Sequence, residues 1–313
     1  MQVVGVEQFG GPEALAVHEV PEPHAGAGSV RIRVQAFAVN PTDTGVRAGQ
    51  RDSSQASPPY VPGMDAAGVI DEVGPDVTGW QVGDEVMAMA LPLSAHGGAY
   101  VQELVAPVGS FTRIPRGTSL PLASTVPMNG LTALQILSHA SLAPGQTLAV
   151  TGAAGLLGNY VVQLAKAAGL TVIADAAEKD EALVRSLGPD HIVPRGDGFA
   201  AAVRELVPDG VDALADAAVQ RSSVVGAVRD GGVFFDVRGW EGNGDRGDRV
   251  RAGDGVLGVP VVRQARAAAA CGGKWDSDAA GSGGAAVCAG WGRRMSGWRL
   301  GGTRGAVRAD VVI

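Results

Sequence analysis

Cysteine is rare in this chain of 313 residues, which holds only Cys271 and Cys288, both near its C-terminal end. Two cysteines make neither a disulfide framework nor a zinc cluster, and their scarcity is typical of a reducing compartment. No cysteine precedes residue 241, so thiolate ligation of a metal is excluded from that part. The five histidines are scattered, and we interpret each as a surface or loop residue: His18, His24, His96, His139 and His191. The sequence therefore predicts no metal site and a cytoplasmic location.

Positive charge and uninterrupted apolar sequence are also in short supply. The formal net charge of −7 gives no reason to expect a nucleic acid or an anionic membrane as a partner. Residues 117–165 carry no formal charge apart from His139, but proline, glycine and polar residues interrupt them. A membrane span needs about 20 continuous apolar residues, so we expect buried α/β core instead. The opening MQVVGVEQFGGPE also lacks the basic and apolar segments of a secretory signal.

The first third of the chain alternates short apolar runs with turn-forming residues. VRIRVQAFAV (30–39) alternates as a strand does, and GVIDEVG (68–74) and DEVMAMA (84–90) are further strand patterns. Between the last two, PDVTGWQVGD (75–84) has the composition of a turn. Short strands joined by many turns predict a partly open β-barrel.

From about residue 119 the pattern changes to helices that alternate with strands. The strand patterns are TLAVTG (147–152), LTVIAD (170–175), HIVP (191–194), VDALADAA (211–218) and GGVFFDV (231–237). The helical patterns between them are residues 155–168, EKDEALVRSLG (178–188), FAAAVRELV (199–207) and SSVVGAVRD (222–230). This alternation predicts an α/β fold with a doubly wound parallel sheet of the Rossmann type.

A glycine-rich segment joins the first of these strands to the first helix, where TLAVTGAAGLLG (147–158) has glycines at 152, 155 and 158. Gly152 permits a tight turn, Gly155 lets backbone N–H groups approach a pyrophosphate, and Gly158 lets helix and strand pack closely. A glycine pattern alone would also fit an ordinary strand–helix turn, but the position between strand and helix favours a dinucleotide site. Its predicted residues are Gly152, Ala153, Ala154, Gly155, Leu156, Leu157 and Gly158.

Asp175 ends the next strand, twenty residues after Gly155. A carboxylate there can accept hydrogen bonds from the ribose hydroxyls of adenosine, which supports the dinucleotide interpretation. The same carboxylate would repel a 2′-phosphate and favours NAD(H). The nearby cations Lys179 and Arg185 favour NADP(H) or are simply solvated charges on a helix face, so the choice between NAD and NADP stays open.

Several further segments form an ordered series: VNPTDTGVRAG (39–49), YVPGMDAAGVIDEVGPDVTGWQVGDEVMA (60–88), GGAYVQELVAP (97–107), PMNGLTAL (127–134) and GAAGLLGNYVVQLAKAAG (152–169). In these segments the chain resembles the medium-chain dehydrogenase/reductase superfamily, specifically its zinc-free quinone oxidoreductase (ζ-crystallin-like) branch. The resemblance covers about residues 1–240. It implies a GroES-like catalytic domain, a Rossmann domain, and an active site in the cleft between them. It also implies NAD(P)H-dependent reduction of quinones or other electron-poor alkenes.

The resemblance assigns roles to individual residues. Zinc-containing relatives have cysteine at the position of Asn40 and Gly-His-Glu at positions 63–65, where this chain has Gly-Met-Asp. Asn40 is the candidate catalytic residue, either as the donor to a substrate carbonyl or as the residue that fixes the turn before Pro41. Many relatives have tyrosine at the position of Gly45, so we expect water to supply the proton here.

Other positions resemble cofactor contacts of the family, and these candidates are Asn129, Thr132, Lys179, Val237 and Arg238. We expect Asp43 and Arg47 to form a structural pair.

The sequence departs from the family after Trp240, where another sheet strand and a return to the catalytic domain would be expected. Residues 241–313 hold seventeen glycines, ten arginines and three of the five tryptophans, with no convincing strand pattern and at most a short helix near 261–270. We hypothesise a shifted reading frame from about residue 243, with a divergent native tail as the rival explanation. The predicted domains are a GroES-like domain at 1–118, a Rossmann domain at 119–242 and a poorly ordered Gly/Arg/Trp-rich tail at 243–313.

The leading functional hypothesis is a metal-free NAD(P)H-dependent oxidoreductase that transfers hydride to a quinone or another activated alkene. The alternatives are an enoyl-thioester reductase and a non-catalytic cofactor-binding protein, either crystallin-like or an inactive truncated product. The expected partner is a small electron-poor substrate. The family implies a homodimer, which the altered C-terminal region puts in doubt together with the activity itself.

Overall fold

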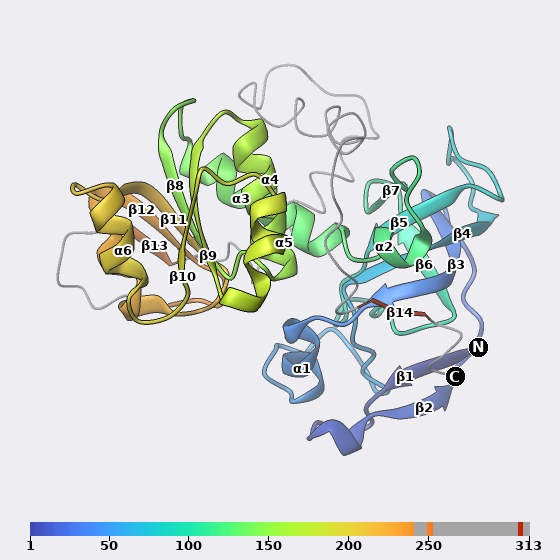
Figure 1. The fold of residues 1–313 in the computed structure, drawn as a ribbon. Coiled ribbons are helices and arrows are strands. Elements are labelled where there is room, and N and C mark those ends of the chain that lie inside the picture. The colour runs from blue at the N-terminus through green and yellow to red at the C-terminus, as the bar shows by residue number, and fades with distance from the viewer. Residues whose placement is uncertain (241–248, 253–305, 309–313) are drawn as a thin grey trace. The chain divides into compact units, whose positions relative to one another are not determined.

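The computed structural model describes residues 1–240, 249–252 and 306–308, and the chain divides into two compact units (Figure 1). Unit 1 contains Met1–Met128 and, among the described residues beyond the gap, residues 306–308. Unit 2 contains residues 129–240 and 249–252. The sequence placed the boundary between residues 118 and 119. The structure places it later because helix α2 (Leu120–Ala123) packs against the strands of unit 1.

Unit 1 is built from short antiparallel strands, as its turn-rich sequence predicts. They are β1 (Gln2–Gly5), β2 (Ala16–Glu19), β3 (Ser29–Ala38), β4 (Asp65–Val73), β5 (Glu85–Met89), β6 (Glu103–Pro107), β7 (Phe111–Arg113) and β14 (Ala306–Arg308). The main sheet has the order β14-β3-β4-β5-β7, and β6 also pairs with β3, while β1 and β2 form a separate pair. The 3₁₀ turn η1 (Pro12–Ala14) and helix α1 (Pro41–Arg47) lie between strands.

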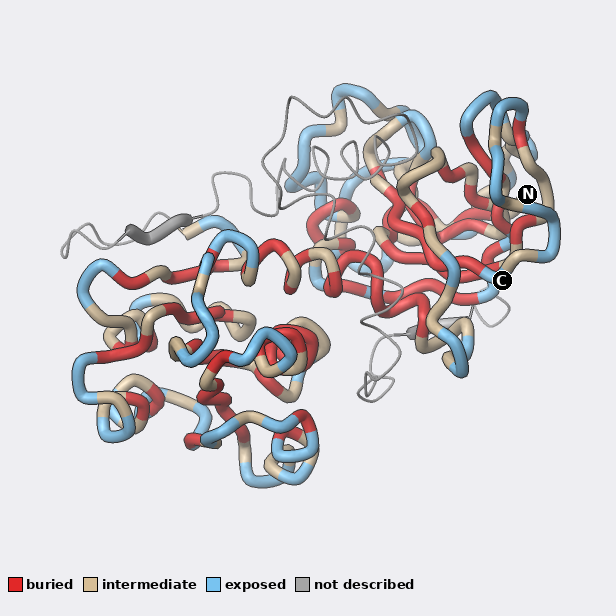
Figure 2. The backbone as a smooth tube through the Cα atoms, turned by 90° about the horizontal axis from the view of Figure 1, so that it is seen from above, coloured by how far each residue is buried: buried red, intermediate tan, exposed pale blue. Residues whose placement is uncertain are grey.

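The core of unit 1 comes from the inward side of these strands. Along β3 buried and more exposed residues alternate over much of its length, and Val30 and Ile32 are fully buried. Ile70 of β4 and Val86 of β5 belong to the same core cluster. In Figure 2 the buried residues follow the strands while the turns between them are exposed.

Unit 2 holds a six-stranded sheet in the order β10-β9-β8-β11-β12-β13. Its strands are β8 (Thr147–Thr151), β9 (Thr171–Ala176), β10 (His191–Pro194), β11 (Val211–Asp216), β12 (Val228–Asp236) and β13 (Arg249–Ala252), and every neighbouring pair is parallel. Because successive strands run outward from β8 in one direction and then from β11 in the other, the strand order reverses between β8 and β11. This is the doubly wound arrangement in which ligands bind beyond the carboxyl ends of the strands.

Helices connect these strands. They are α3 (Pro127–Ala140), which begins at the end of unit 1, α4 (Leu156–Ala167), α5 (Glu181–Ser186) and α6 (Phe199–Leu206), with the 3₁₀ turns η2 (Glu178–Asp180), η3 (Arg221–Ser223) and η4 (Val225–Ala227). Helix α4 packs against β8 and β9, and its amphipathic sequence ends at Gly169, whose φ of +77° suits a residue without Cβ.

Two expectations from the sequence are wrong. The pattern SSVVGAVRD predicted a helix, but the structure has η3 and η4 followed by β12 from Val228, because Gly226 and the β-branched valines disfavour a helix. The sequence also indicated no strand beyond residue 242, whereas β13 extends the sheet of unit 2 and β14 pairs with β3. The possible helix near 261–270 and the rest of the predicted poorly ordered tail lie outside the described residues.

The start of α4 generates a testable prediction about stability. A Cβ at position 158 would lie 2.3 Å from the backbone oxygen of Gly152, so Gly158→Ala should lower the free energy of unfolding by about 1–3 kcal/mol. Gly198→Ala is the matched control, because a Cβ there meets nothing within 4 Å. Guanidinium denaturation of both variants checks this. Equal stability of the two would contradict the close packing at Gly158.

Candidate functional site

Three buried polar side chains meet where β3 leads into α1. Asn40 is 5% exposed, Asp43 is 4% exposed and Asp65, the first residue of β4, is fully buried. The antiparallel register of β3 and β4 pairs Phe37 with Ala66, so Asn40 is brought close to the start of β4. A polar cluster at this depth must satisfy its own hydrogen bonds.

The Asp65 carboxylate accepts two hydrogen bonds within unit 1. The Asn40 side-chain amide donates from Nδ2 to Oδ2 at 2.6 Å, and the Met128 backbone N–H donates to Oδ1 at 2.5 Å. Met128 lies in the first turn of α3, so the carboxylate occupies a position that the helix dipole favours for an anion. Asp65 therefore fixes the orientation of the Asn40 amide and caps a helix at the same time.

The Asp43 carboxylate is held by donors from three segments. It accepts hydrogen bonds from the backbone N–H of Asn40 (2.7 Å), the backbone N–H of Gly63 (3.3 Å) and the hydroxyl of Tyr100 (3.0 Å). Asp43 thus has no contact with Arg47 of the kind expected, and Arg47 instead donates to the Gly10 carbonyl. The sequence reasoning missed Tyr100, although a tyrosine inside the segment GGAYVQELVAP pointed to a buried hydroxyl that needs a partner.

Burial dominates the electrostatics of this cluster. It raises the pKa of Asp65 to about 7 despite the bonds from Met128 and Asn40, and the neighbouring Asp43 charge raises it further. Burial also raises the pKa of Asp43 against the opposing effect of its three hydrogen bonds. The pKa of Tyr100 is raised by burial and by the Asp43 carboxylate. Two carboxyl groups that share a dry pocket favour the protonated form of at least one.

Zinc-containing relatives have ligands at position 40 and in the segment 63–65. In this chain Asn40 donates a hydrogen bond to Asp65, and Met64 occupies the position of the histidine. An amide and a methionine are poor substitutes for thiolate and imidazole as zinc ligands. Among the described residues, no group of three or more histidine, cysteine, aspartate or glutamate side chains is arranged to hold a metal ion.

In unit 2 the glycine loop leads from β8 into α4 as predicted. Gly152 has a φ of +66°, and its carbonyl accepts the N–H of Gly155 at 2.8 Å, which closes the turn. Gly155 is exposed and stands at the N-cap of α4 with a φ of −80°, and a Cβ there would lie 3.1 Å from the backbone oxygen of Gly152.

The donors that this loop can offer an anion lie in the first turn of α4. The N–H groups of Leu156, Leu157 and Gly158 begin the helix, and such groups have no acceptor inside it. The N–H of Ala153 is already engaged, because it donates to the Asp175 carboxylate at 2.9 Å. The structure therefore divides the predicted loop residues into a helix end that can bind phosphate and a turn that is held from within.

Asp175 lies at the end of β9 and is only 1% exposed. Its Oδ1 accepts the Ala153 N–H, while its Oδ2 is buried without a hydrogen-bond partner. The Nε atom of Arg195, which follows β10, lies 3.9 Å from that oxygen. Asp175 thus ties the glycine loop to the neighbouring strand through Oδ1, while Oδ2 faces Arg195 without a hydrogen bond.

The other predicted cofactor residues are spread over unit 2. Asn129 and Thr132 are buried one turn apart on α3, and Lys179 is exposed in η2. Val237 and Arg238 follow β12, where the Arg238 N–H donates to Asp236 Oδ1 at 2.9 Å. Arg185, the second cation considered beside Lys179, pairs with Glu181 of its own helix.

A second polar group at the same sheet edge went unnoticed in the sequence. Asp216 ends β11, Asp236 ends β12, and both are buried. Asp216 accepts a hydrogen bond from the backbone N–H of Arg221, and Asp236 accepts one from its side chain. The signal was present, because VDALAD and GGVFFD each end an apolar strand with aspartate at the edge where ligands bind.

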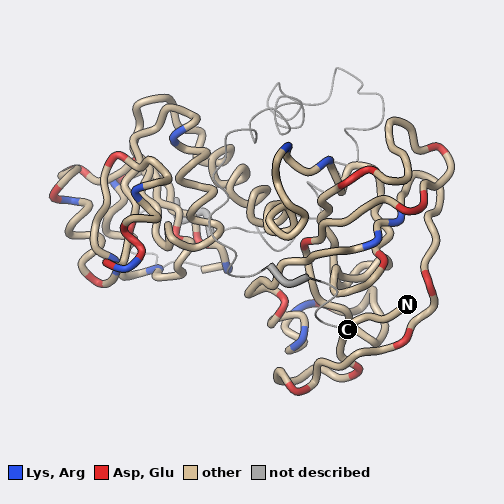
Figure 3. The backbone as a smooth tube through the Cα atoms, turned by 45° about the vertical axis from the view of Figure 1, so that its right-hand side comes forward, with Lys and Arg blue, Asp and Glu red and all other residues tan. Residues whose placement is uncertain are grey.

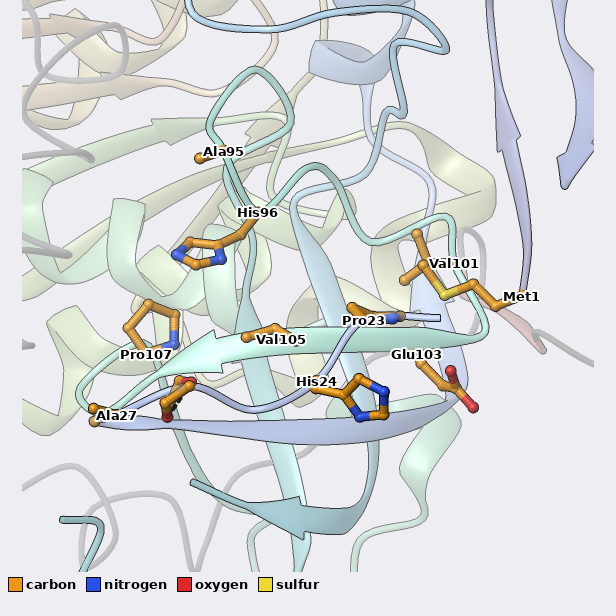
Figure 4. A pocket seen from close by; sticks show the side chains of 13 residues that line it. Met1, Pro23, His24, Ala27, Ala95, His96, Val101, Glu103, Val105 and Pro107 are labelled. Atoms are coloured by element: carbon orange, nitrogen blue, oxygen red, sulfur yellow. Dashed lines mark hydrogen bonds between the residues drawn. The ribbon is translucent and has the colours of Figure 1, made fainter. Parts of the chain in front are cut away.

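A cavity of about 450 Å³ lies elsewhere in unit 1. Met1, His24, His96, Glu103 and Pro107 are among its lining residues, and Figure 4 shows them around the cavity. None of the cluster residues at Asn40 lines it, and His24 is bonded to Glu72 at 3.2 Å. We assign no function to this cavity.

Positive and negative residues are interspersed along the traces of both units in Figure 3. None of the helices in the described ranges is long and apolar enough to cross a membrane.

A unit of antiparallel strands with a buried polar cluster, followed by a Rossmann unit with a glycine loop, is the arrangement typical of two-domain nucleotide-dependent dehydrogenases. Family comparison agrees: residues 26–116 match the alcohol dehydrogenase GroES-like domain, and residues 157–242 match the zinc-binding dehydrogenase family. An alcohol dehydrogenase of Geobacillus stearothermophilus is 33% identical over 74% of this chain and 76% of its own. The chain therefore belongs to the medium-chain dehydrogenase/reductase superfamily.

Other relatives are similar over a smaller share of their length. A 2-haloacrylate reductase of Burkholderia sp. is 35% identical over 67% of this chain and 64% of its own. The chloroplastic quinone-oxidoreductase QR1 of Triphysaria versicolor is 33% identical over 62% and 60%. The chain thus spans about half to two thirds of the length of several curated relatives that it matches. Among solved structures, a mycobacterial protein complexed with NADPH has a TM-score of 0.65 and 29% identity, covering 75% of this chain and 73% of its own.

The buried Asp65 carboxyl makes stability depend on pH. Its pKa rises from about 4 in an unfolded chain to about 7 in the fold, so folding favours the protonated form. The stabilisation is complete below pH ~4 and is lost as the pH rises through about 7, because the unfolded chain releases the proton first. Asp65→Asn should show a smaller fall in the free energy of unfolding between pH 5 and pH 8. Denaturant titrations of both proteins at the two pH values check this, and parallel losses would contradict it.

Proposed function

We propose that this chain is an NAD(P)H-dependent oxidoreductase that reduces a quinone or another electron-poor alkene without a metal. The observation that carries the proposal is the glycine loop at the N-terminus of α4, with the buried Asp175 beside it. This combination is typical of dinucleotide sites.

The residues of unit 2 fit a dinucleotide on two grounds. First, exposed Gly155 leaves the N–H groups at the start of α4 accessible. Its φ of −80° is one that any residue can adopt, so the backbone conformation does not require glycine here, and we attribute the glycine to the need for a small residue. Second, Asp175 Oδ2 is a buried acceptor without a hydrogen-bond partner, although Arg195 Nε lies 3.9 Å away, and leaving such an atom without a hydrogen bond costs about 1–3 kcal/mol. The 3′-hydroxyl of the adenosine ribose, which NADH and NADPH share, would supply the missing donor.

The substrate class is supported by the relatives and by the polar cluster of unit 1. One relative is named for 2-haloacrylate and another for quinones, and both names describe a carbon–carbon double bond conjugated to a carbonyl or carboxyl group. A bound nicotinamide would supply hydride to such an acceptor. Of the two roles that its position allows, we assign Asn40 the hydrogen bond to the substrate carbonyl, with Asp65 holding its amide in orientation.

The experiment that tests the function pairs turnover with cofactor binding. We expect the protein to oxidise NADPH or NADH in the presence of 9,10-phenanthrenequinone or 2-chloroacrylate. Gly155→Val should weaken cofactor binding at least tenfold, because the side chain occupies the space over the helix end. A Cβ at position 155 would lie 3.1 Å from the backbone oxygen of Gly152, so denaturant titration of the variant accompanies the binding measurement and separates a loss of fold from a loss of the site. Binding without turnover of any such acceptor would favour the non-catalytic alternative, and unaltered binding by the variant would remove the site from the glycine loop.

Between the two cofactors we favour NADPH. Asp175 is buried and engaged by Ala153, and the exposed guanidinium of Arg195 lies 3.9 Å from its other oxygen, so its repulsion of a 2′-phosphate is reduced. Lys179 is also exposed, but Glu178 and Asp180 flank it in η2, so we assign the main contribution to Arg195. The related structure that holds NADPH supports this choice.

A substitution of Arg195 tests the preference. Arg195→Ala should weaken NADPH binding by about tenfold or more and change NADH binding much less, because a charge-assisted bond to phosphate is lost. Lys179→Ala is the comparison variant and should have the smaller effect. Fluorescence titration with both cofactors measures the ratio of dissociation constants. A wild-type protein that binds NADH more tightly, or a variant that weakens both cofactors equally, would contradict the assignment.

A further inference from the structure

The loop after β11 has a strained backbone. Val219 has a φ of +58° and Arg221 a φ of +53°. Residues other than glycine rarely adopt this region, and a β-branched side chain is especially unfavourable there. Such strain persists only where the surroundings enforce it, and it concentrates at functional sites.

Buried side chains from three strand ends enforce this conformation. Asp216 accepts the Thr151 hydroxyl at 2.6 Å and the Arg221 N–H at 2.7 Å. Asp236 Oδ2 accepts a hydrogen bond from the Nε–H of Arg221 at 3.2 Å. The loop is therefore anchored to the carboxyl ends of β8, β11 and β12 together.

The same loop lies directly against the glycine turn. A Cβ at Gly152 would lie 3.2 Å from the backbone atoms of Ala217 and Ala218, and the Ala218 N–H donates to the Thr151 hydroxyl at 3.3 Å. The loop thus stands on the β11 side of the glycine turn, as Asp175 stands on the β9 side.

Gln220 sits between the two strained residues, and its side-chain oxygen has no partner. Its Oε1 is buried without a hydrogen bond, while the backbone carbonyl of the same residue accepts from Ser223. A buried amide oxygen without a donor costs free energy that a ligand N–H can recover. Two segments that border the glycine turn therefore each hold a buried oxygen without a hydrogen bond. These are Asp175 Oδ2 on β9, which also lies 3.9 Å from Arg195 Nε, and Gln220 Oε1 in loop 217–221.

We propose that Gln220 Oε1, held between the strained residues Val219 and Arg221, accepts a hydrogen bond from the carboxamide N–H of the nicotinamide. This inference rests on the proposed function. A doubly wound sheet binds one mononucleotide on each half, and Asp175 on β9 marks the adenosine half. The nicotinamide half then lies toward β11 and β12, where Gln220 is found.

The test uses cofactors that differ in one donor group. The probes are NADP⁺, its 3-acetylpyridine analogue, which lacks the carboxamide N–H, and 2′-phospho-ADP-ribose, which lacks nicotinamide, with the NAD⁺ series in parallel. The wild-type protein should bind the natural cofactor about threefold to tenfold more tightly than the acetylpyridine analogue in calorimetric titrations. Gln220→Met, which keeps the side-chain length without the acceptor, should abolish this ratio and leave binding of the ADP-ribose fragment unchanged.

Two further variants complete the comparison. Gln220→Glu retains an acceptor oxygen and should retain the preference, and Ser222→Ala, an exposed neighbour in the same turn, should behave as wild type. If the wild-type protein binds the natural cofactor and its 3-acetylpyridine analogue equally, the inference is overturned. An unchanged preference for the natural cofactor in Gln220→Met overturns it as well. If the wild-type protein binds neither 2′-phospho-ADP-ribose nor ADP-ribose, the proposed dinucleotide site itself is overturned. The failure of the proposed function is thereby distinguished from the failure of the inference about Gln220.

Discussion

Helix α4 can begin where it does because Gly158 lies against the backbone of Gly152, at a distance that leaves no room for a Cβ. This contact sets the height of the helix over β8 and the direction in which its first N–H groups point. It also defines the turn to which Asp175 binds from one side and loop 217–221 packs from the other. The close approach between these two glycines thus lies at the centre of the cofactor edge of unit 2, with Asp175 and loop 217–221 on either side of it.

Unit 1 solves a different electrostatic problem. At positions where zinc-containing relatives use a cation to balance anionic ligands, this chain has an amide and a carboxyl group that bind each other. Without a cation, two buried carboxyl groups can be accommodated only by backbone and hydroxyl donors and by retention of a proton, which is the direction in which the pKa values of Asp43 and Asp65 move. The geometry of Asn40 therefore depends on hydrogen bonds whose strength varies with protonation.

The sequence predicted the parts that repeat a local pattern. Strand and helix periodicity located β3, β8, β9 and α4, and the resemblance extended this to both units and to the family. It failed in the valine-rich segment 222–230, where Gly226 and the β-branched valines disfavour a helix and β12 already begins at Val228, which pairs with Val211 of β11. It also failed for β13 and β14, which are short strands defined by their neighbours. The bonds of Asp175 to Ala153 and of Tyr100 to Asp43 join residues 22 and 57 positions apart, and no local pattern encodes such pairs.

Asp175 Oδ2 and Gln220 Oε1, the two buried oxygens without a hydrogen bond, also bear on the stability of the folded chain. Each carries a free-energy cost that a hydrogen bond from a dinucleotide would remove. Under the proposed function, folding and cofactor binding are therefore linked equilibria, and the folded fraction rises with the free cofactor concentration relative to its dissociation constant. The supply of nicotinamide dinucleotide would then contribute to the stability of this protein as well as to its rate of turnover.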